Sequence, residues 1–130
     1  MSLELQVLQF NTIYNVPTAG IPKLPNDIEA TRVHNLILEE LIELNEAIDN
    51  NDIVEVADAL ADIIYVTAQQ AVTLGFPVDA LLREVQRSNM SKLGEDGKPI
   101  FREDGKVLKG LSYTPPNIVS ILKQHGYTGD

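Results

Sequence analysis

A chain of 130 residues with 44% apolar side chains is long enough to fold around one core and too apolar to be wholly disordered. The absence of cysteine excludes disulfides and cysteine-ligated zinc and favours the cytoplasm. The net charge of −9 disfavours a nucleic-acid-binding protein, and no apolar run approaches the roughly 18 residues that a membrane span needs. The first ten residues contain an acid and no base, so no targeting segment is expected.

Charged residues are distributed unevenly along the chain. No Lys or Arg lies between Arg32 and Arg83, and eight of the ten basic residues come after position 82. The stretch without bases contains ten acids: Glu39, Glu40, Glu43, Glu46, Asp49, Asp52, Glu55, Asp58, Asp62 and Asp79. An acidic middle is therefore followed by a basic tail, and the function has to account for this asymmetry.

Apolar residues recur at helical spacing through the first 92 positions, which predicts an all-α, four-helix-bundle-like domain spanning residues 1–130. The proline-rich stretch 16–25 is expected to be a loop, and the short polar turn 49–52 should make the second and third helices antiparallel neighbours. The helices are expected at 3–14, about 26–49, 53–74 and about 77–92.

The C-terminal third changes character. Glu-Asp-Gly-Lys occurs at 95–98 and again at 103–106, and Asp-Gly is a strong hairpin-turn signal. We expect Ile100-Phe101 and Val107-Leu108 to form a small β-hairpin around the second copy. Pro115-Pro116 should then open a short final helix that ends near Leu122.

The third helix is apolar nearly all round, which predicts a buried helix. Its only charged residues, Glu55, Asp58 and Asp62, fall within about 60° of arc at 100° per residue. Glu40 and Glu43 form a second acidic stripe on the preceding helix. Buried unpaired carboxylates are costly, and three arrangements would relieve that cost: a solvated face, ion pairs with distant bases, or a hard divalent cation such as Mg²⁺.

Two motifs resemble a known superfamily. The run 39–43, Glu-Glu-Leu-Ile-Glu, followed by Glu-Val-Ala-Asp at 55–58, is similar to the EExxE…ExxD signature of MazG-like and phosphoribosyl-ATP pyrophosphohydrolases. Arg-Ser-Asn-Met-Ser-Lys at 87–92, the Asp-Gly-Lys segments and Tyr113-x-Pro115-Pro116 resemble one branch of that superfamily. The resemblance covers nearly the whole chain and implies an all-α nucleotide pyrophosphohydrolase.

The resemblance implies a role for each site residue. The metal ligands would be Glu40, Glu43, Glu55 and Asp58, binding Mg²⁺ or, as the alternative, Mn²⁺. Glu39 would complete the site and activate the attacking water, and Asn89 and Lys92 would contact the nucleotide. Asp62 lies one turn beyond Asp58 and is open to two readings, as a contact to the base or sugar of the substrate or as structural polarity.

The expected reaction is Mg²⁺-dependent cleavage of the α–β phosphoanhydride of a nucleoside triphosphate to monophosphate and pyrophosphate. A phosphoribosyl-ATP pyrophosphohydrolase and a non-catalytic helical interaction module are the alternatives. The third helix has more apolar surface than the other segments can cover, so a homodimer or a dimer of dimers is also expected.

Overall fold

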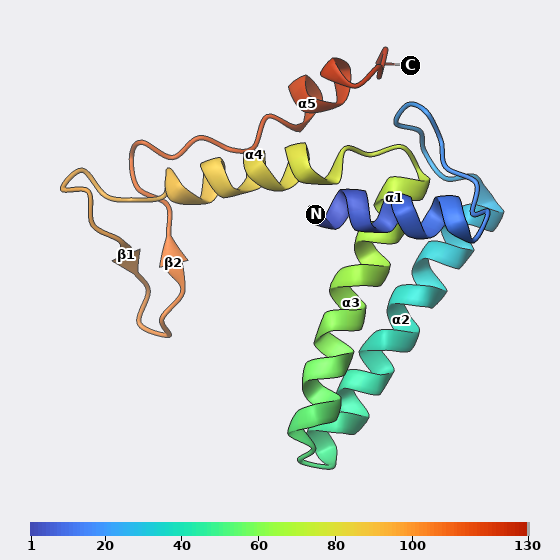
Figure 1. The fold of residues 1–130 in the computed structure, drawn as a ribbon. Coiled ribbons are helices and arrows are strands. Elements are labelled where there is room, and N and C mark those ends of the chain that lie inside the picture. Colours follow the sequence, from blue (N-terminus) through green and yellow to red (C-terminus); the bar gives the residue numbers. More distant parts are fainter. Residues whose placement is uncertain (130) are drawn as a thin grey trace.

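The computed structural model describes residues 1–129 and is mostly helical (Figure 1). Two long helices form an extended arm, three shorter helices gather at its base, and a β-hairpin projects from the end of the fourth helix. None of the described helices is long and apolar enough to cross a membrane. The elements are α1 (Leu3–Ile13), α2 (Asp27–Asp49), α3 (Ile53–Thr73), α4 (Val78–Met90), β1 (Ile100–Phe101), β2 (Val107–Leu108) and α5 (Ile118–Gln124).

The α2–α3 arm is an antiparallel pair whose ends are set by local signals. Asn26 and Glu29 cap α2 reciprocally, because each side chain accepts a hydrogen bond from the other residue's backbone N–H, at 2.8 and 3.1 Å. Asp52 caps α3 by accepting from the N–H groups of Val54 and Glu55. Between them, Asn51 adopts a positive φ of 52°, which closes the turn and confirms the predicted antiparallel pairing.

The core lies at the base of the arm, where α1, α3 and α4 meet. Val7, Ala68, Val72 and Val78 form a buried apolar cluster. Beside it, the buried amide of Asn11 donates to Thr73 Oγ1 at 3.3 Å and to Thr18 Oγ1 at 3.1 Å. These bonds tie α1 and the following loop to the C-terminal end of α3, which satisfies a polar group that burial would otherwise penalise.

Contacts between α4 and the segment before α5 fix the C-terminal part of the chain. The Arg87 guanidinium donates to Glu84, to Thr114 Oγ1 and to the carbonyl of Pro115, while Ser88 Oγ donates to the carbonyl of Thr114 at 2.8 Å. Within the 87–92 motif, Arg87 and Ser88 therefore hold the segment before α5 against α4.

Three helix boundaries differ by two residues or more from the sequence-based prediction. The last helix begins at Ile118 rather than at Pro115-Pro116, because the Asn117 side chain caps it by accepting from the N–H of Ser120. It also continues to Gln124, two residues beyond the predicted end at Leu122. The α4 helix ends at Met90, so Lys92 lies just after it.

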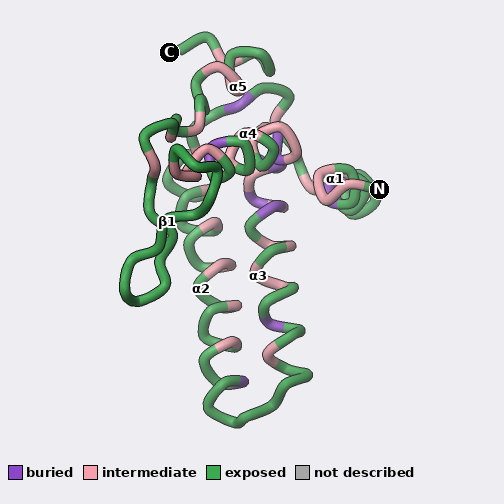
Figure 2. Tube along the Cα trace, turned by 90° about the vertical axis from the view of Figure 1, so that its left-hand side faces the viewer, coloured by how far each residue is buried: buried purple, intermediate pink, exposed green. Residues whose placement is uncertain are grey.

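The expectation that the third helix is buried is wrong for a single chain. The buried residues of α3 concentrate near the base of the arm, and most of its other residues are exposed or half-buried (Figure 2). Ile53 is 83% exposed and Ile64 is 60% exposed. The physical reason is that, among the described elements, α2 contacts α3 alone, so the outer part of the arm is only two helices thick.

Gly75 follows the end of α3 and packs closely against the backbone of Ile21, which a substitution can test. Its φ is +82°, and a Cβ there would lie 2.3 Å from the carbonyl oxygen of Ile21. Gly97 has a similar φ of +74°, but a Cβ there would meet nothing within 4 Å. Gly97→Ala should therefore cost only about 1 kcal/mol of backbone strain, whereas Gly75→Ala should cost roughly 2–4 kcal/mol. Urea unfolding of both variants measures the difference, and equal losses would contradict the close packing at Gly75.

Candidate functional site

Three carboxylates meet across the arm. Glu40 and Glu43 from α2 and Asp62 from α3 each place one oxygen within 4.8 Å of the others. This meeting follows from the short turn, which fixes the register of the antiparallel pair and sets Asp62 opposite the Glu40–Glu43 turn of α2. Like charges this close repel each other, so the group is unfavourable unless a proton or a cation is present.

Glu40 is the most constrained member of this group. Its Oε2 atom is buried and has no hydrogen-bond partner within the described residues. Burial is the main cause that raises the pKa of the Glu40 carboxyl above its usual range, and the negative charges of Glu43, Asp62 and Glu39 add to the rise. An unpartnered buried oxygen beside two further carboxylates matches the oxygen donor set of a hard divalent cation. The residues present therefore fit a metal ion.

The other predicted acids lie outside this group of three. Glu39, Glu55 and Asp58 are exposed. The α3 position that faces α2 at this level is Ala59, which is 4% exposed. The structure thus brings together two of the four predicted metal ligands. The third carboxylate is Asp62, which the sequence left open as a substrate contact or as structural polarity. In the sequence, Asp62 was noticeable only through its helical spacing from Asp58. Its closeness to Glu40 and Glu43 depends on the register between the two helices.

The predicted nucleotide contacts lie apart from the carboxylates. Asn89 is exposed on the last turn of α4, and Lys92 is half-buried after its end. Within residues 1–129, α4 makes no contact with α2, and no hydrogen bond or ion pair joins either side chain to the acids of the arm. One chain does not bring the predicted substrate residues to its own carboxylates.

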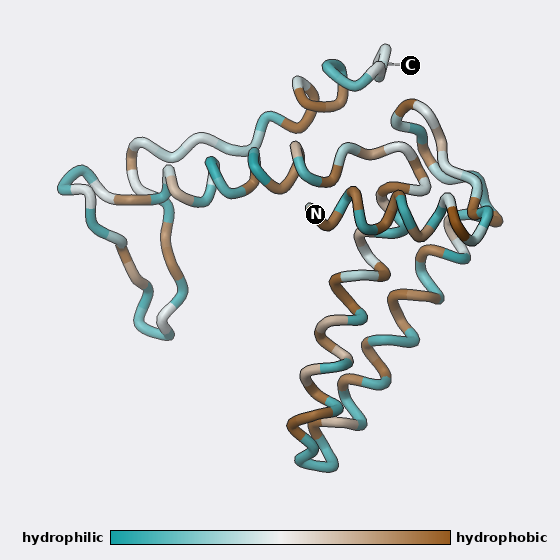
Figure 3. The backbone as a smooth tube through the Cα atoms, in the orientation of Figure 1, coloured by the Kyte–Doolittle hydropathy of each residue, from teal (hydrophilic) through white to brown (hydrophobic). Residues whose placement is uncertain are grey.

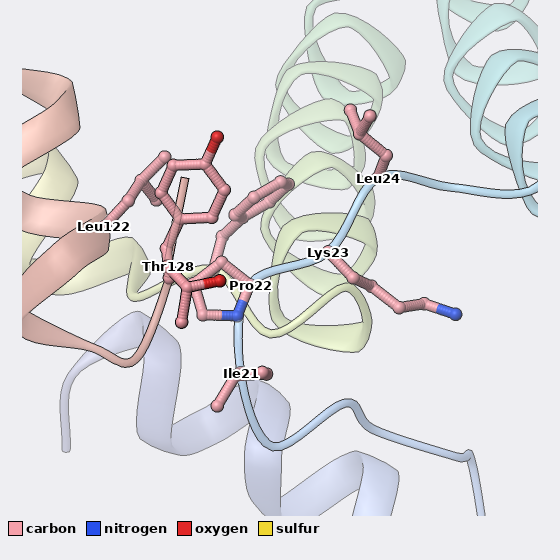
Figure 4. Close-up of a pocket in the computed structure, with 8 residues that line it drawn as sticks. Ile21, Pro22, Lys23, Leu24, Leu122 and Thr128 are labelled. Atoms are coloured by element: carbon pink, nitrogen blue, oxygen red, sulfur yellow. The ribbon is translucent and has the colours of Figure 1, made fainter. Parts of the chain in front are cut away.

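A separate hollow of about 430 Å³ lies between the 21–24 loop and the C-terminal segment (Figure 4). Its walls are mostly apolar and contain none of the predicted site residues. They are formed by Ile21, Pro22, Lys23, Leu24, Phe76, Leu122, Tyr127 and Thr128. Without an acid or a convergent set of polar groups, this hollow is a poor candidate for phosphate chemistry.

Comparison with known proteins agrees with the geometry. A family model described as phosphoribosyl-ATP pyrophosphohydrolase matches residues 9–89, which is 81 of the 130 residues and includes the acids of the arm. No curated protein matches the chain. Metal dependence is typical of this family, and the described chain has the acidic cluster of Glu40, Glu43 and Asp62. The chain belongs to the phosphoribosyl-ATP pyrophosphohydrolase family, within the MazG-like all-α superfamily, and is a hydrolase that acts on phosphoanhydride bonds.

Proposed function

We propose that the protein is a Mg²⁺-dependent nucleoside triphosphate pyrophosphohydrolase. The observation that carries this proposal is the buried, unpartnered Oε2 of Glu40 within a group of three carboxylates, in a family of pyrophosphohydrolases. A triphosphate carries about four negative charges, so bare carboxylates would repel it. Bound Mg²⁺ would supply the positive charge that holds the phosphates, polarises phosphorus and acidifies a water molecule.

The candidate site residues take different roles in the proposed reaction. Glu40, Glu43 and Asp62 are the innermost metal ligands, and Glu55 and Asp58 extend the same acidic side toward the arm's tip. Glu39 accepts a proton from the attacking water. The water oxygen forms a bond to the α-phosphorus, the α–β anhydride bond breaks, and pyrophosphate leaves. Asn89 and Lys92 contact the nucleotide, provided that they reach the site from another chain.

Phosphoribosyl-ATP is the second candidate substrate, because the matching family model bears that description. The same anhydride bond is cleaved in either case. Phosphoribosyl-ATP carries an additional phosphate, which would require a further cationic contact, and Arg32 is the only Lys or Arg in the α2 and α3 sequences. Binding of phosphoribosyl-ATP would therefore need a cation from outside the arm.

We further propose that the active form is a homodimer or a larger assembly of dimers. The chain exposes 9032 Å², whereas a compact protein of 14.3 kDa exposes about 6,800 Å². The excess of about 2,200 Å² per chain corresponds to about 4,400 Å² over two chains, which lies within the range of total area that obligate dimers bury. Apolar residues continue along the arm to its tip, where no other element of the described chain covers them (Figure 3).

Metal binding can be measured without substrate. Mg²⁺ or Mn²⁺ should raise the melting temperature by roughly 2–6 °C, because a ligand that binds only the folded state stabilises it. Glu40→Gln should abolish that rise while stabilising the metal-free protein, since it removes a repelled carboxylate. Glu46→Gln, an exposed acid of the same helix, is the matched control and should keep the full response. An identical response in both variants would count against Glu40 as a ligand.

The bond that is cleaved identifies the reaction class. With Mg²⁺ and a panel of nucleoside triphosphates plus phosphoribosyl-ATP, phosphorus NMR should show a monophosphate product and pyrophosphate. Glu43→Gln should lower kcat by about 100-fold or more, because the metal contributes several kcal/mol of transition-state stabilisation. Orthophosphate and a nucleoside diphosphate as first products would overturn the assignment, and hydrolysis of phosphoribosyl-ATP alone would favour the second candidate.

Solution mass tests the assembly. Light scattering at micromolar concentration should give a mass at least twice the 14.3 kDa of one chain. Leu60→Glu would place a charge on an apolar part of the arm that is 47% exposed in the single chain, and it should dissociate the assembly. Thr31→Glu, an exposed change at the base of the arm, is the control. A wild-type mass near that of one chain would refute the dimer.

A further inference from the structure

The tetrapeptide Glu-Asp-Gly-Lys occurs twice after α4, and the backbone of its two copies makes the same turn. In each copy the glycine N–H donates to the carbonyl three residues earlier. Gly97 donates to Gly94 at 3.0 Å, and Gly105 donates to Arg102 at 2.9 Å. The two glycines have positive φ values of +74° and +88°, and a Cβ on either would meet nothing within 4 Å. The two copies are therefore a matched pair within one chain.

The aspartates of the two copies also have the same backbone contact. Asp96 Oδ1 accepts from the N–H of Lys98 at 3.0 Å, and Asp104 Oδ1 accepts from the N–H of Lys106 at 3.1 Å. This bond holds each carboxyl group beside the main chain of its own turn. Both Asp-Gly pairs are exposed, and both turns lie beyond the end of α4 (Figure 1). Solvent therefore reaches both aspartates.

Arg102 makes the difference between the two copies. Its guanidinium donates to both carboxylate oxygens of Asp104, from Nε to Oδ1 at 2.8 Å and from Nη2 to Oδ2. Asp96 forms no ion pair within the described residues. A bidentate pair fixes the carboxylate plane and favours the ionised form, so Arg102 is the main cause that lowers the pKa of the Asp104 carboxyl below its usual range.

An exposed Asp-Gly pair can undergo a reaction of its own. The glycine nitrogen bonds to Cγ of the aspartate, since no glycine Cβ hinders the approach. The C–OH bond of the protonated carboxyl breaks, and the hydroxyl leaves as water together with the amide proton. Water then adds to the cyclic imide. Where it breaks the bond between the nitrogen and the main-chain carbonyl carbon, the chain continues through the side chain, which gives an isoaspartyl residue of unchanged mass.

We propose that Asp96 is a site of isoaspartyl formation in the folded protein and that Arg102 protects Asp104 in the identical tetrapeptide. Arg102 keeps the Asp104 carboxyl ionised, which makes its oxygen a poor leaving group, and prevents its rotation toward the nitrogen of Gly105. Asp96 has only the bond from Lys98 to restrain it. Its modification adds a methylene to the main chain between α4 and β1. This inference does not depend on the hydrolysis or the assembly proposed above.

The full chain is incubated for several weeks at physiological temperature and neutral pH, and samples are digested with chymotrypsin. Cleavage after Leu93, Phe101 and Leu108 places the two aspartates on separate peptides, 94–101 and 102–108. Each isoaspartyl peptide is separated by chromatography against a synthetic standard and confirmed with an isoaspartyl methyltransferase and a labelled methyl donor. Arg102→Gln removes the ion pair. Lys109→Gln, an exposed basic residue of the same segment, is the matched control.

Isoaspartate should form about 2- to 5-fold faster at Asp96 than at Asp104, which is the factor by which an exposed ion pair typically holds its partner. Arg102→Gln should raise the rate at Asp104 to that at Asp96, and Lys109→Gln should leave the ratio unchanged. In urea the wild-type rates should become nearly equal, because the two tetrapeptides are identical.

Equal rates in the folded wild-type protein would overturn the proposal, as would an Asp104 that stays slow in Arg102→Gln. A ratio that persists in urea would also overturn it, because the difference would then come from the flanking sequence and not from the folded turn.

Discussion

Repulsion among three carboxylates of the arm, two half-buried and one exposed, is the constraint to which the other features of the structure relate. Glu40, Glu43 and Asp62 each place one oxygen within 4.8 Å of the others because of the register of two antiparallel helices, and one Glu40 oxygen has no hydrogen-bond partner in the described chain. No Lys or Arg lies between Arg32 and Arg83 that could neutralise them locally. The fold therefore positions these carboxylates for a cation. Their mutual repulsion destabilises the folded chain when no cation is bound, and a bound metal ion with its phosphate ligands would relieve that repulsion.

The single chain also leaves many apolar side chains of the arm uncovered. Only the base of the arm has a third layer of helices, formed by α1 and α4, and the core cluster around Val72 is confined to it. Beyond that point, apolar side chains such as Leu60 and Ile64 remain exposed. Association of two chains through their arms, as proposed above, would cover these exposed apolar side chains.

Local signals made much of the fold predictable. Asn26, Asp52 and Gly75 mark helix ends through capping or positive φ, and these effects involve only neighbouring residues. The hairpin was likewise expected at the observed strands, because Asp-Gly determines the turn and thereby the pairing of Phe101 with Val107. The 39–43 motif also indicated the part of α2 that contributes Glu40 and Glu43 to the carboxylate group.

The remaining features depend on contacts that no local pattern encodes. Asp62 joins Glu40 because of the cross-helix register, and helical spacing alone grouped it with Glu55 and Asp58. The structural role of Arg87 and Ser88 depends on Thr114, more than twenty residues away. The third helix was expected to be buried because of its composition, but a single chain buries only five of its 21 residues. Composition indicates how much apolar surface must be covered and not which chain covers it.

Whether the three carboxylates of the arm hold a divalent cation can be decided by anomalous scattering from crystals grown with Mn²⁺. Mn²⁺ prefers the same oxygen donors as Mg²⁺ and can be located without assuming its ligands. We expect an anomalous peak about 2.2 Å from oxygens of Glu40, Glu43 and Asp62. A well-ordered arm without a peak between these residues, with Glu40 Oε2 hydrogen-bonded to a neighbouring protein group instead, would contradict it.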